Sequence, residues 1–193
     1  MRTISLVCLA LSLVFFVLAM ASSASAGRVW NTEFLLWSRA PEEWIKVGGS
    51  ARVPRGADGI ARSEATRFKA FTYPSQSDLS MRYGYNFTLW VPGLAYSECK
   101  PTAVEGMDPS TVSCRSDTDT YYRFRFVRPS WQTGVVDNIL EDGYSVFIQD
   151  VYTGKFCAIW PWPSNNAGMK CLDDTPGEGT NLLDGHLFHF HWN

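Results

Sequence analysis

Three segments of this chain repeat one pattern, and this repetition constrains the fold more than any other feature of the sequence. Each segment begins with a stretch in which every second side chain is apolar, at 33–37, 86–90 and 145–149. A period of two places alternate side chains on one face, which is typical of a strand that is buried on one side. After a turn with Pro or Gly, a second strand-like stretch follows, at 44–47, 96–99 and 156–159.

The ends of the three segments are also alike. Each closes on a strand-like stretch in which phenylalanine alternates with basic residues, at 67–71, 123–126 and 187–191. No long stretch has helical periodicity, and the best candidate, 130–141, contains Gly134 and is predicted to be a loop. The sequence therefore predicts an all-β protein of three repeats, each with about four strands, at about 28–82, 83–140 and 141–193.

The first 26 residues have the features of an export signal. A positive charge at Arg2 precedes an uncharged apolar run, Ile4–Met20, and small residues follow at 24–26. We expect a signal peptide, 1–26, that is cleaved to leave one secreted, extracellular domain, 27–193. The alternative is an uncleaved membrane anchor, but no later stretch is apolar enough to span a bilayer.

Export gives the remaining cysteines and one asparagine a definite chemistry. Cys99 and Cys157 lie in the second strand-like stretch of their repeats, and Cys114 and Cys171 follow at similar spacings. An even number of cysteines in a secreted chain indicates disulfides, and four cysteines allow three connectivities. The repeat favours the local pairs Cys99–Cys114 and Cys157–Cys171. The sequon at Asn86 predicts N-linked glycosylation.

Three four-stranded repeats without a long helix resemble the β-trefoil superfamily, and the resemblance covers about 28–193. It implies a short barrel of six strands that is capped by three hairpins. The first repeat matches least, because it has no cysteine and the segment Arg52–Gly56 fills its hairpin. The alternative architecture is a two-sheet sandwich.

Few features indicate catalysis, so we expect a non-catalytic protein without a cofactor. The sequence contains no nucleophile elbow, no Cys-x-x-Cys and no glycine-rich phosphate loop. His189 and His191 would share one strand face, but two ligands hold a metal only weakly, so we expect no metal site. A formal net charge of −2 argues against a nucleic-acid partner, because phosphate neutralisation needs a basic surface.

The third hairpin holds the best candidate binding site. Trp160 and Trp162 are each followed by proline, which favours a loop in which indole rings are exposed and stack on sugars. Nearby polar side chains supply hydrogen bonds. The predicted ligand-binding set is Asp150, Tyr152, Trp160, Trp162, Asn165 and Asn166. It resembles the hairpin pocket of trefoil lectins, although the Gln-x-Trp motif of ricin-type lectins is absent. The alternative is that one of the two tryptophans fills the bottom of the barrel and the other has no role in binding.

The leading prediction is thus a secreted, lectin-like module whose partners are glycans or extracellular proteins, with the oligomeric state left open. Kunitz-type protease inhibitors resemble the chain in architecture and imply a second function, in which a basic loop offers Arg52 or Arg55 to a trypsin-like protease. A third possibility is a matrix or adhesion protein. Basic residues on equivalent strands form a further pattern suited to acidic glycans: Arg67, Lys69, Arg123, Arg125, His189 and His191.

Overall fold

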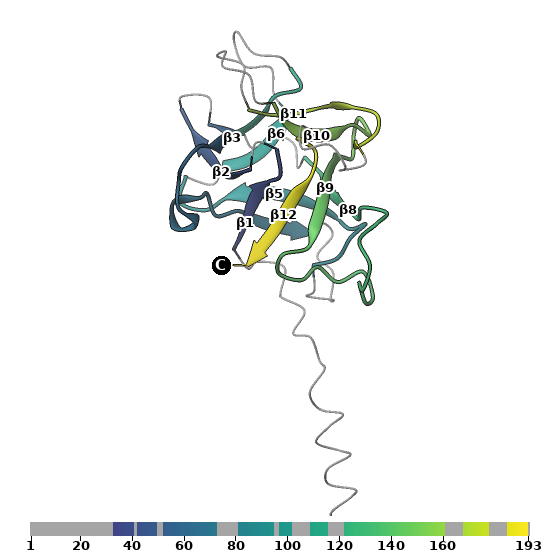
Figure 1. Cartoon of the computed structure of the whole chain (residues 1–193). Helices are drawn as coiled ribbons and strands as arrows, with labels where there is room; N and C mark the ends of the chain where they lie inside the picture. The colour runs from purple at the N-terminus through teal and green to yellow at the C-terminus, as the bar shows by residue number, and fades with distance from the viewer. Residues whose placement is uncertain are drawn as a thin grey trace, which may run out of the picture.

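The computed structural model describes residues 33–40, 42–49, 52–72, 81–94, 97–101, 109–115, 122–160, 168–177 and 185–192. These ranges contain strands and one short 3-10 helix, η1 (Arg62–Glu64), but no α-helix (Figure 1). The strands are β1 (Phe34–Ser38), β2 (Glu43–Gly48), β3 (Val53–Ala57), β4 (Lys69–Thr72), β5 (Asn86–Val91), β6 (Ser97–Pro101), β7 (Val112–Arg115), β8 (Phe124–Val127), β9 (Ser145–Asp150), β10 (Phe156–Trp160), β11 (Gly168–Asp173) and β12 (Phe188–Trp192). The prediction of an all-β protein is confirmed.

The sheet closes on itself as a ring. β12 pairs with β1 on one side and with β9 on the other, and β8 joins β9 to β5, which pairs with β4. All of these pairs are antiparallel. Between β4 and β1 the ring is closed by Phe34 and Phe68, which exchange backbone hydrogen bonds of 2.9 and 2.8 Å. Figure 1 shows β1, β12, β9 and β8 in this order.

The other strands form hairpins that start from the ring. β2 and β3 follow β1, β6 and β7 follow β5, and β10 and β11 follow β9. The hairpins also touch one another, since the amide of Cys114 donates to the carbonyl of Arg52 at 2.9 Å. Gly168 permits a close approach of two hairpins, because a Cβ there would lie 2.3 Å from Cγ1 of Val53.

Phenylalanine side chains fill the interior. Those that are almost fully buried are Phe34, Phe68, Phe87, Phe124, Phe126, Phe188 and Phe190. Phe190 lies in the middle of this cluster, with its ring centroid 4.7 Å from that of Phe34 and 5.8 Å from that of Phe126. Their burial matches the side of each strand that the alternation of apolar residues indicates. Within the core, these rings pack against one another mostly edge to face or tilted.

Both expected disulfides are present. Cys99–Cys114 joins β6 to β7, and Cys157–Cys171 joins β10 to β11. In each case the two cysteines are direct partners in the strand register. The local pairing that the repeat favoured is confirmed, and the two bonds make the protein typical of a compartment outside the cytosol.

The expectation of an exposed basic loop at Arg52–Gly56 is wrong. Val53 to Gly56 lie in strand β3, where Val53 and Pro54 are buried and Arg55 is half-buried. β3 stands at the end of the strand order, and a proline is tolerated on such an edge strand because the strand needs no complete ladder of N–H donors. The segment 130–141, in contrast, has turns and no helix, as predicted.

Some expectations fall outside the described residues. They are the signal peptide at 1–26 and three members of the predicted ligand-binding set, Trp162, Asn165 and Asn166. Within the described ranges, no helix has the length and hydropathy that crossing a bilayer requires.

Candidate ligand-binding site

A buried carboxylate organises the turn between β9 and β10. Asp150 ends β9, and its side chain is buried. One carboxylate oxygen accepts a hydrogen bond from the amide of Tyr152 at 2.8 Å, and the other accepts the hydroxyl of Thr153. An aspartate that bonds the backbone two residues later forms an Asx turn. Asp150 therefore fixes the shape of this turn from inside.

A second aromatic residue reaches the same carboxylate from a distant part of the chain. Tyr122, just before β8, donates its hydroxyl to Asp150, and its own amide donates to the carboxylate of Glu98 at 2.6 Å. Burial and the neighbouring Asp150 carboxylate raise the pKa of Tyr122 well above its ordinary value. The phenol thus remains a hydrogen-bond donor throughout the physiological range.

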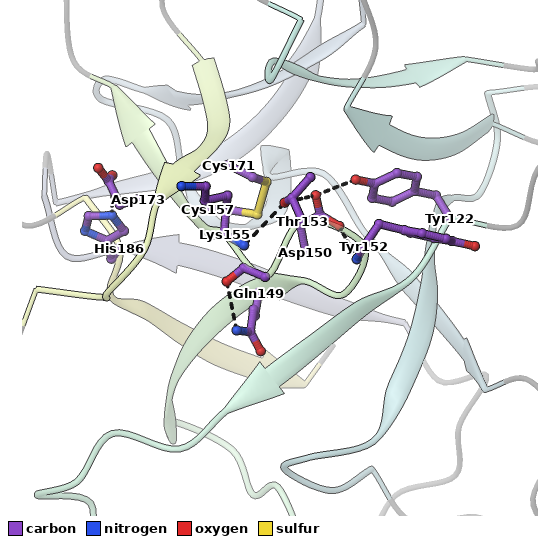
Figure 2. The surroundings of a disulfide bond; sticks show 11 residues. Tyr122, Gln149, Asp150, Tyr152, Thr153, Lys155, Cys157, Cys171, Asp173 and His186 are labelled. Carbon is purple, nitrogen blue, oxygen red and sulfur yellow. Dashed lines mark hydrogen bonds and ion pairs between the residues drawn. A yellow bond between two sulfur atoms is a disulfide. The ribbon is translucent and has the colours of Figure 1, made fainter.

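The two tyrosines form an aromatic platform, which we define as Tyr122 and Tyr152. Their ring centroids lie 5.1 Å apart with an angle of 40° between the planes. Tyr152 is 63% exposed, whereas Tyr122 is half-buried. Figure 2 shows the two rings side by side, with Asp150 and Thr153 next to them. An exposed ring supported from behind by a second ring is a preformed apolar surface.

Polar side chains lie around the same hairpin (Figure 2). Gln149 donates through Nε2 to a carbonyl of the turn at 2.9 Å. Lys155 pairs with Asp174 at 2.6 Å, and His186 pairs with Asp173 at 2.7 Å. Because Asp174 is largely exposed, the ion pair between Lys155 and Asp174 contributes little to stability. Both side chains of this pair therefore stay accessible to a ligand.

The predicted site residues have different fates. Asp150 and Tyr152 are brought together, but the Asp150 carboxylate is taken up by donors of the protein itself. Trp160 ends β10 and is half-buried, with an indole Nε1 that is enclosed and has no hydrogen-bond partner in the described part of the chain. Tyr122 was missed, because it lies 28 residues before Asp150 and no sequence pattern connects the two.

Of the two arginines of the inhibitor alternative, Arg52 lies in the turn before β3 and Arg55 lies within the strand. Arg52 donates from Nη1 to the hydroxyl of Ser97 at 2.9 Å. Arg55 lies within β3 opposite Lys46 of β2. A substrate-like inhibitor needs a protruding segment that enters the protease cleft. No structural observation on these two arginines supports that function.

The basic strand faces do not form a uniform belt either. Arg67 and Lys69 both pair with Glu33, at 3.6 and 3.7 Å. Arg125 donates from Nε to Oδ1 of Asn86 at 3.0 Å, so the half-buried asparagine of the predicted glycosylation site lies on β5 against β8.

The histidines of β12 pack against indole rings. The His189 ring lies 5.2 Å from that of Trp37, and the His191 ring lies 5.3 Å from that of Trp44. Burial lowers the pKa of both imidazoles, while Asp142 beside His191 opposes this effect at the second site. The described residues contain no group of three side chains suited to a metal ion.

This burial predicts a pH dependence of stability. The pKa of each histidine is lower in the folded than in the unfolded protein, where it is about 6.5. The contribution of the neutral imidazoles to the free energy of unfolding is therefore complete above about pH 6.5 and is lost as the pH falls from there through the pKa of the folded state. We therefore expect the free energy of unfolding, measured with urea from about pH 7 to about pH 5, to fall more steeply for the wild type than for His189→Gln/His191→Gln. Parallel pH profiles for the two proteins would contradict the assignment.

The fold and the site define an all-β, disulfide-bonded protein with an exposed tyrosine platform on one hairpin. The chain belongs to the family described as a domain of unknown function, DUF5888, which matches residues 3–183. A search of the curated proteins found no match in sequence.

Several solved structures share the fold at low sequence identity. The SDF2-like protein from Arabidopsis thaliana is 10% identical with a TM-score of 0.55, over 85% of this chain and 94% of that one. The water-soluble chlorophyll protein from Brassica oleracea is 5% identical with a TM-score of 0.55, over 86% and 93%. The Pmt1-Pmt2 protein O-mannosyltransferase complex of S. cerevisiae is 13% identical with a TM-score of 0.56, over 86% and 25%. These similarities concern the fold alone.

Proposed function

We propose that this chain is a secreted, non-catalytic carbohydrate-binding protein of the lectin-like kind, with a β-trefoil fold. The trefoil is supported by the closed ring of β1, β4, β5, β8, β9 and β12 and by the hairpins that follow β1, β5 and β9. Secretion is supported by the two disulfides together with the expected signal peptide at 1–26.

The observation that carries the binding proposal is the exposed Tyr152 ring on a fixed turn. An aromatic ring that is 63% exposed leaves apolar surface in water unless something covers it. The C–H faces of a pyranose match such a surface in size and polarity. The proposed contact is therefore a stack of one sugar ring on Tyr152.

The groups behind the ring give it rigidity rather than direct contacts. Asp150 holds the amide of Tyr152 and the hydroxyl of Tyr122, so the ring platform is set before a ligand arrives. Preorganisation reduces the conformational entropy that is lost on binding. Gln149, Lys155 and Asp174 then lie in reach of the turn and offer donors and acceptors for sugar hydroxyls.

Replacement of Tyr152 by alanine tests this function. On an array of neutral and sulfated glycans, we expect selective binding by the wild type, and about tenfold weaker binding of the neutral glycans by Tyr152→Ala, because one stacked ring contributes of the order of 1 kcal/mol or more. Tyr152→Phe keeps the ring and is expected to keep most of the affinity.

The matched control is Trp131→Ala. Trp131 is a second exposed aromatic side chain, 45% accessible, and lies in the loop between β8 and β9 away from the turn. The substitution Trp131→Ala is expected to leave glycan binding unchanged. An array on which the wild type binds no neutral glycan, or on which Tyr152→Ala binds the neutral glycans as well as the wild type, would reject the proposed site.

A further inference from the structure

A second cluster of rings lies on the outer face of β1, β2 and β12. β12 pairs with the first residues of β9, whereas the turn that carries Tyr152 follows the last residue of β9. Trp37 of β1 is the direct register partner of Trp44 on β2 and of His189 on β12. His191 is two residues further along β12, on the same face. All four side chains are half-buried, so each presents part of its ring to solvent. We call this set the indole–imidazole face.

The face has the extent of a short oligosaccharide. Neighbouring strands are about 4.8 Å apart, so the row from β2 through β1 to β12 spans about 10 Å, close to the length of two sugar units. Indole and imidazole rings offer flat surfaces to C–H groups, as the tyrosine platform does. The ring contacts of 5.2 and 5.3 Å join the four side chains in two pairs, Trp37 with His189 and Trp44 with His191, and the two pairs are neighbours because Trp37 and Trp44 are register partners.

Charged groups surround the two imidazoles unevenly. His191 faces Asp142, 3.8 Å from its Nδ1, and Arg62, whose guanidinium lies 5.7 Å from the centre of the Trp44 ring. Arg62 is held in place by donation to the carbonyl of Trp192 at 2.5 Å. Asp142 in turn accepts the amide of Trp192 at 2.6 Å, and this bond holds the carboxylate beside His191.

His189 faces a hydroxyl and a positive charge. Its Nδ1 lies 3.4 Å from the hydroxyl of Ser145 on β9, and Arg39, just after β1, acts on it as a like charge when the imidazole is protonated. Among the described residues that act on the two imidazoles, protonation of both histidines would thus leave Arg39, Arg62 and two imidazolium groups against the carboxylate of Asp142. Such a face attracts an anion, and it does so more strongly under mildly acidic conditions, when the two imidazolium charges add to those of the arginines.

From this geometry we propose that the indole–imidazole face is a second binding site, which takes an acidic sugar that carries a carboxylate or a sulfate and does so more tightly at mildly acid pH. The sugar rings stack on Trp37 and Trp44, and the anionic group pairs with the imidazolium groups of His189 and His191 and with Arg62. Linkage requires that the anion, when bound, raises proton affinity at both histidines. The site is separate from Tyr152 and does not depend on the function proposed for that residue.

The test uses a hexasaccharide of alternating uronic acid and sulfated glucosamine as the probe, with a neutral hexasaccharide of N-acetylglucosamine beside it. The Kd for the sulfated probe, measured by calorimetry on the oxidised full domain, is expected to be about tenfold lower at about pH 5 than at about pH 7.5. His189→Gln/His191→Gln is expected to abolish this pH dependence. Arg67→Gln/Lys69→Gln, which removes a basic pair from another ring strand, is expected to retain it.

An affinity for the sulfated probe that is equal at both pH values, or a pH dependence that survives in His189→Gln/His191→Gln, would overturn the proposal. Equal affinity for the two probes at acid pH would overturn it as well. If the double variant does not fold, proton NMR of the wild-type imidazoles replaces it. Addition of the sulfated probe is expected to shift the titration of both His189 and His191 to higher pH, and unchanged titration curves would overturn the proposal. Tyr152→Ala is expected to bind the sulfated probe like the wild type.

Discussion

Replacement of Phe190 by alanine is expected to lower the free energy of unfolding by about 3–5 kcal/mol. Phe190 is fully buried and touches the rings of Phe34, Phe126 and Trp192, which come from three different strands. Removal of its ring loses the transfer energy of a large apolar group and leaves a cavity that these neighbours cannot fill. Urea unfolding followed by tryptophan fluorescence measures the loss.

Phe71→Ala is the matched control for this substitution. Phe71 lies on β4 of the same ring but is 38% exposed, so its removal creates no enclosed cavity. We expect a loss of no more than about 1 kcal/mol. Similar losses for the two variants would mean that the interior of the ring is not the packed core described here. Should Phe190→Ala fail to fold, Phe190→Leu is expected to fold with a smaller but measurable loss.

Removal of the Cys157–Cys171 disulfide is expected to have the second largest effect. The two residues are separated by 14 positions, and closing a loop of this size stabilises a protein by about 3 kcal/mol in the chain-entropy model. We therefore expect Cys157→Ser/Cys171→Ser to unfold at a clearly lower urea concentration than the wild type, under non-reducing conditions.

The equivalent bond on the second hairpin provides the comparison. Cys99–Cys114 has a separation of 15, so Cys99→Ser/Cys114→Ser is expected to lose a similar amount. Only the loss of the Cys157–Cys171 bond is expected also to weaken glycan binding, because β10 leads directly out of the turn that carries Tyr152. An unchanged urea midpoint after loss of either bond would contradict the entropic account.

The parts of the fold that depend on local pattern were accessible from the sequence. The alternation around Phe34, Phe87 and Val146 identified β1, β5 and β9, because burial of one face imposes a period of two. The position of the cysteines within the pattern identified their partners. β3 was missed, because proline and glycine at Pro54 and Gly56 are typical of loops and an edge strand tolerates both.

The candidate site was only partly accessible. Asp150 and Tyr152 were selected, but Asp150 was expected to contact a ligand, and the structure places its carboxylate under the turn. The Asx-turn signal in Asp150–Gly154 is visible in the sequence and favours this local role. Tyr122 could not be predicted from the sequence, because its contact with Asp150 arises only when β8 pairs with β9. The packing of His189 on Trp37 likewise depends on the register between β12 and β1.

The most direct test of the binding account observes the tyrosine rings themselves. With ring-labelled tyrosine in the oxidised wild-type domain, NMR spectra are recorded while the neutral glycan that binds best on the array is added. We expect the ring signals of Tyr152 and, to a smaller extent, Tyr122 to shift in proportion to saturation, while that of the buried Tyr83 stays in place. A glycan that binds without moving the Tyr152 signal would contradict the account, because its binding surface would then lie elsewhere on the molecule.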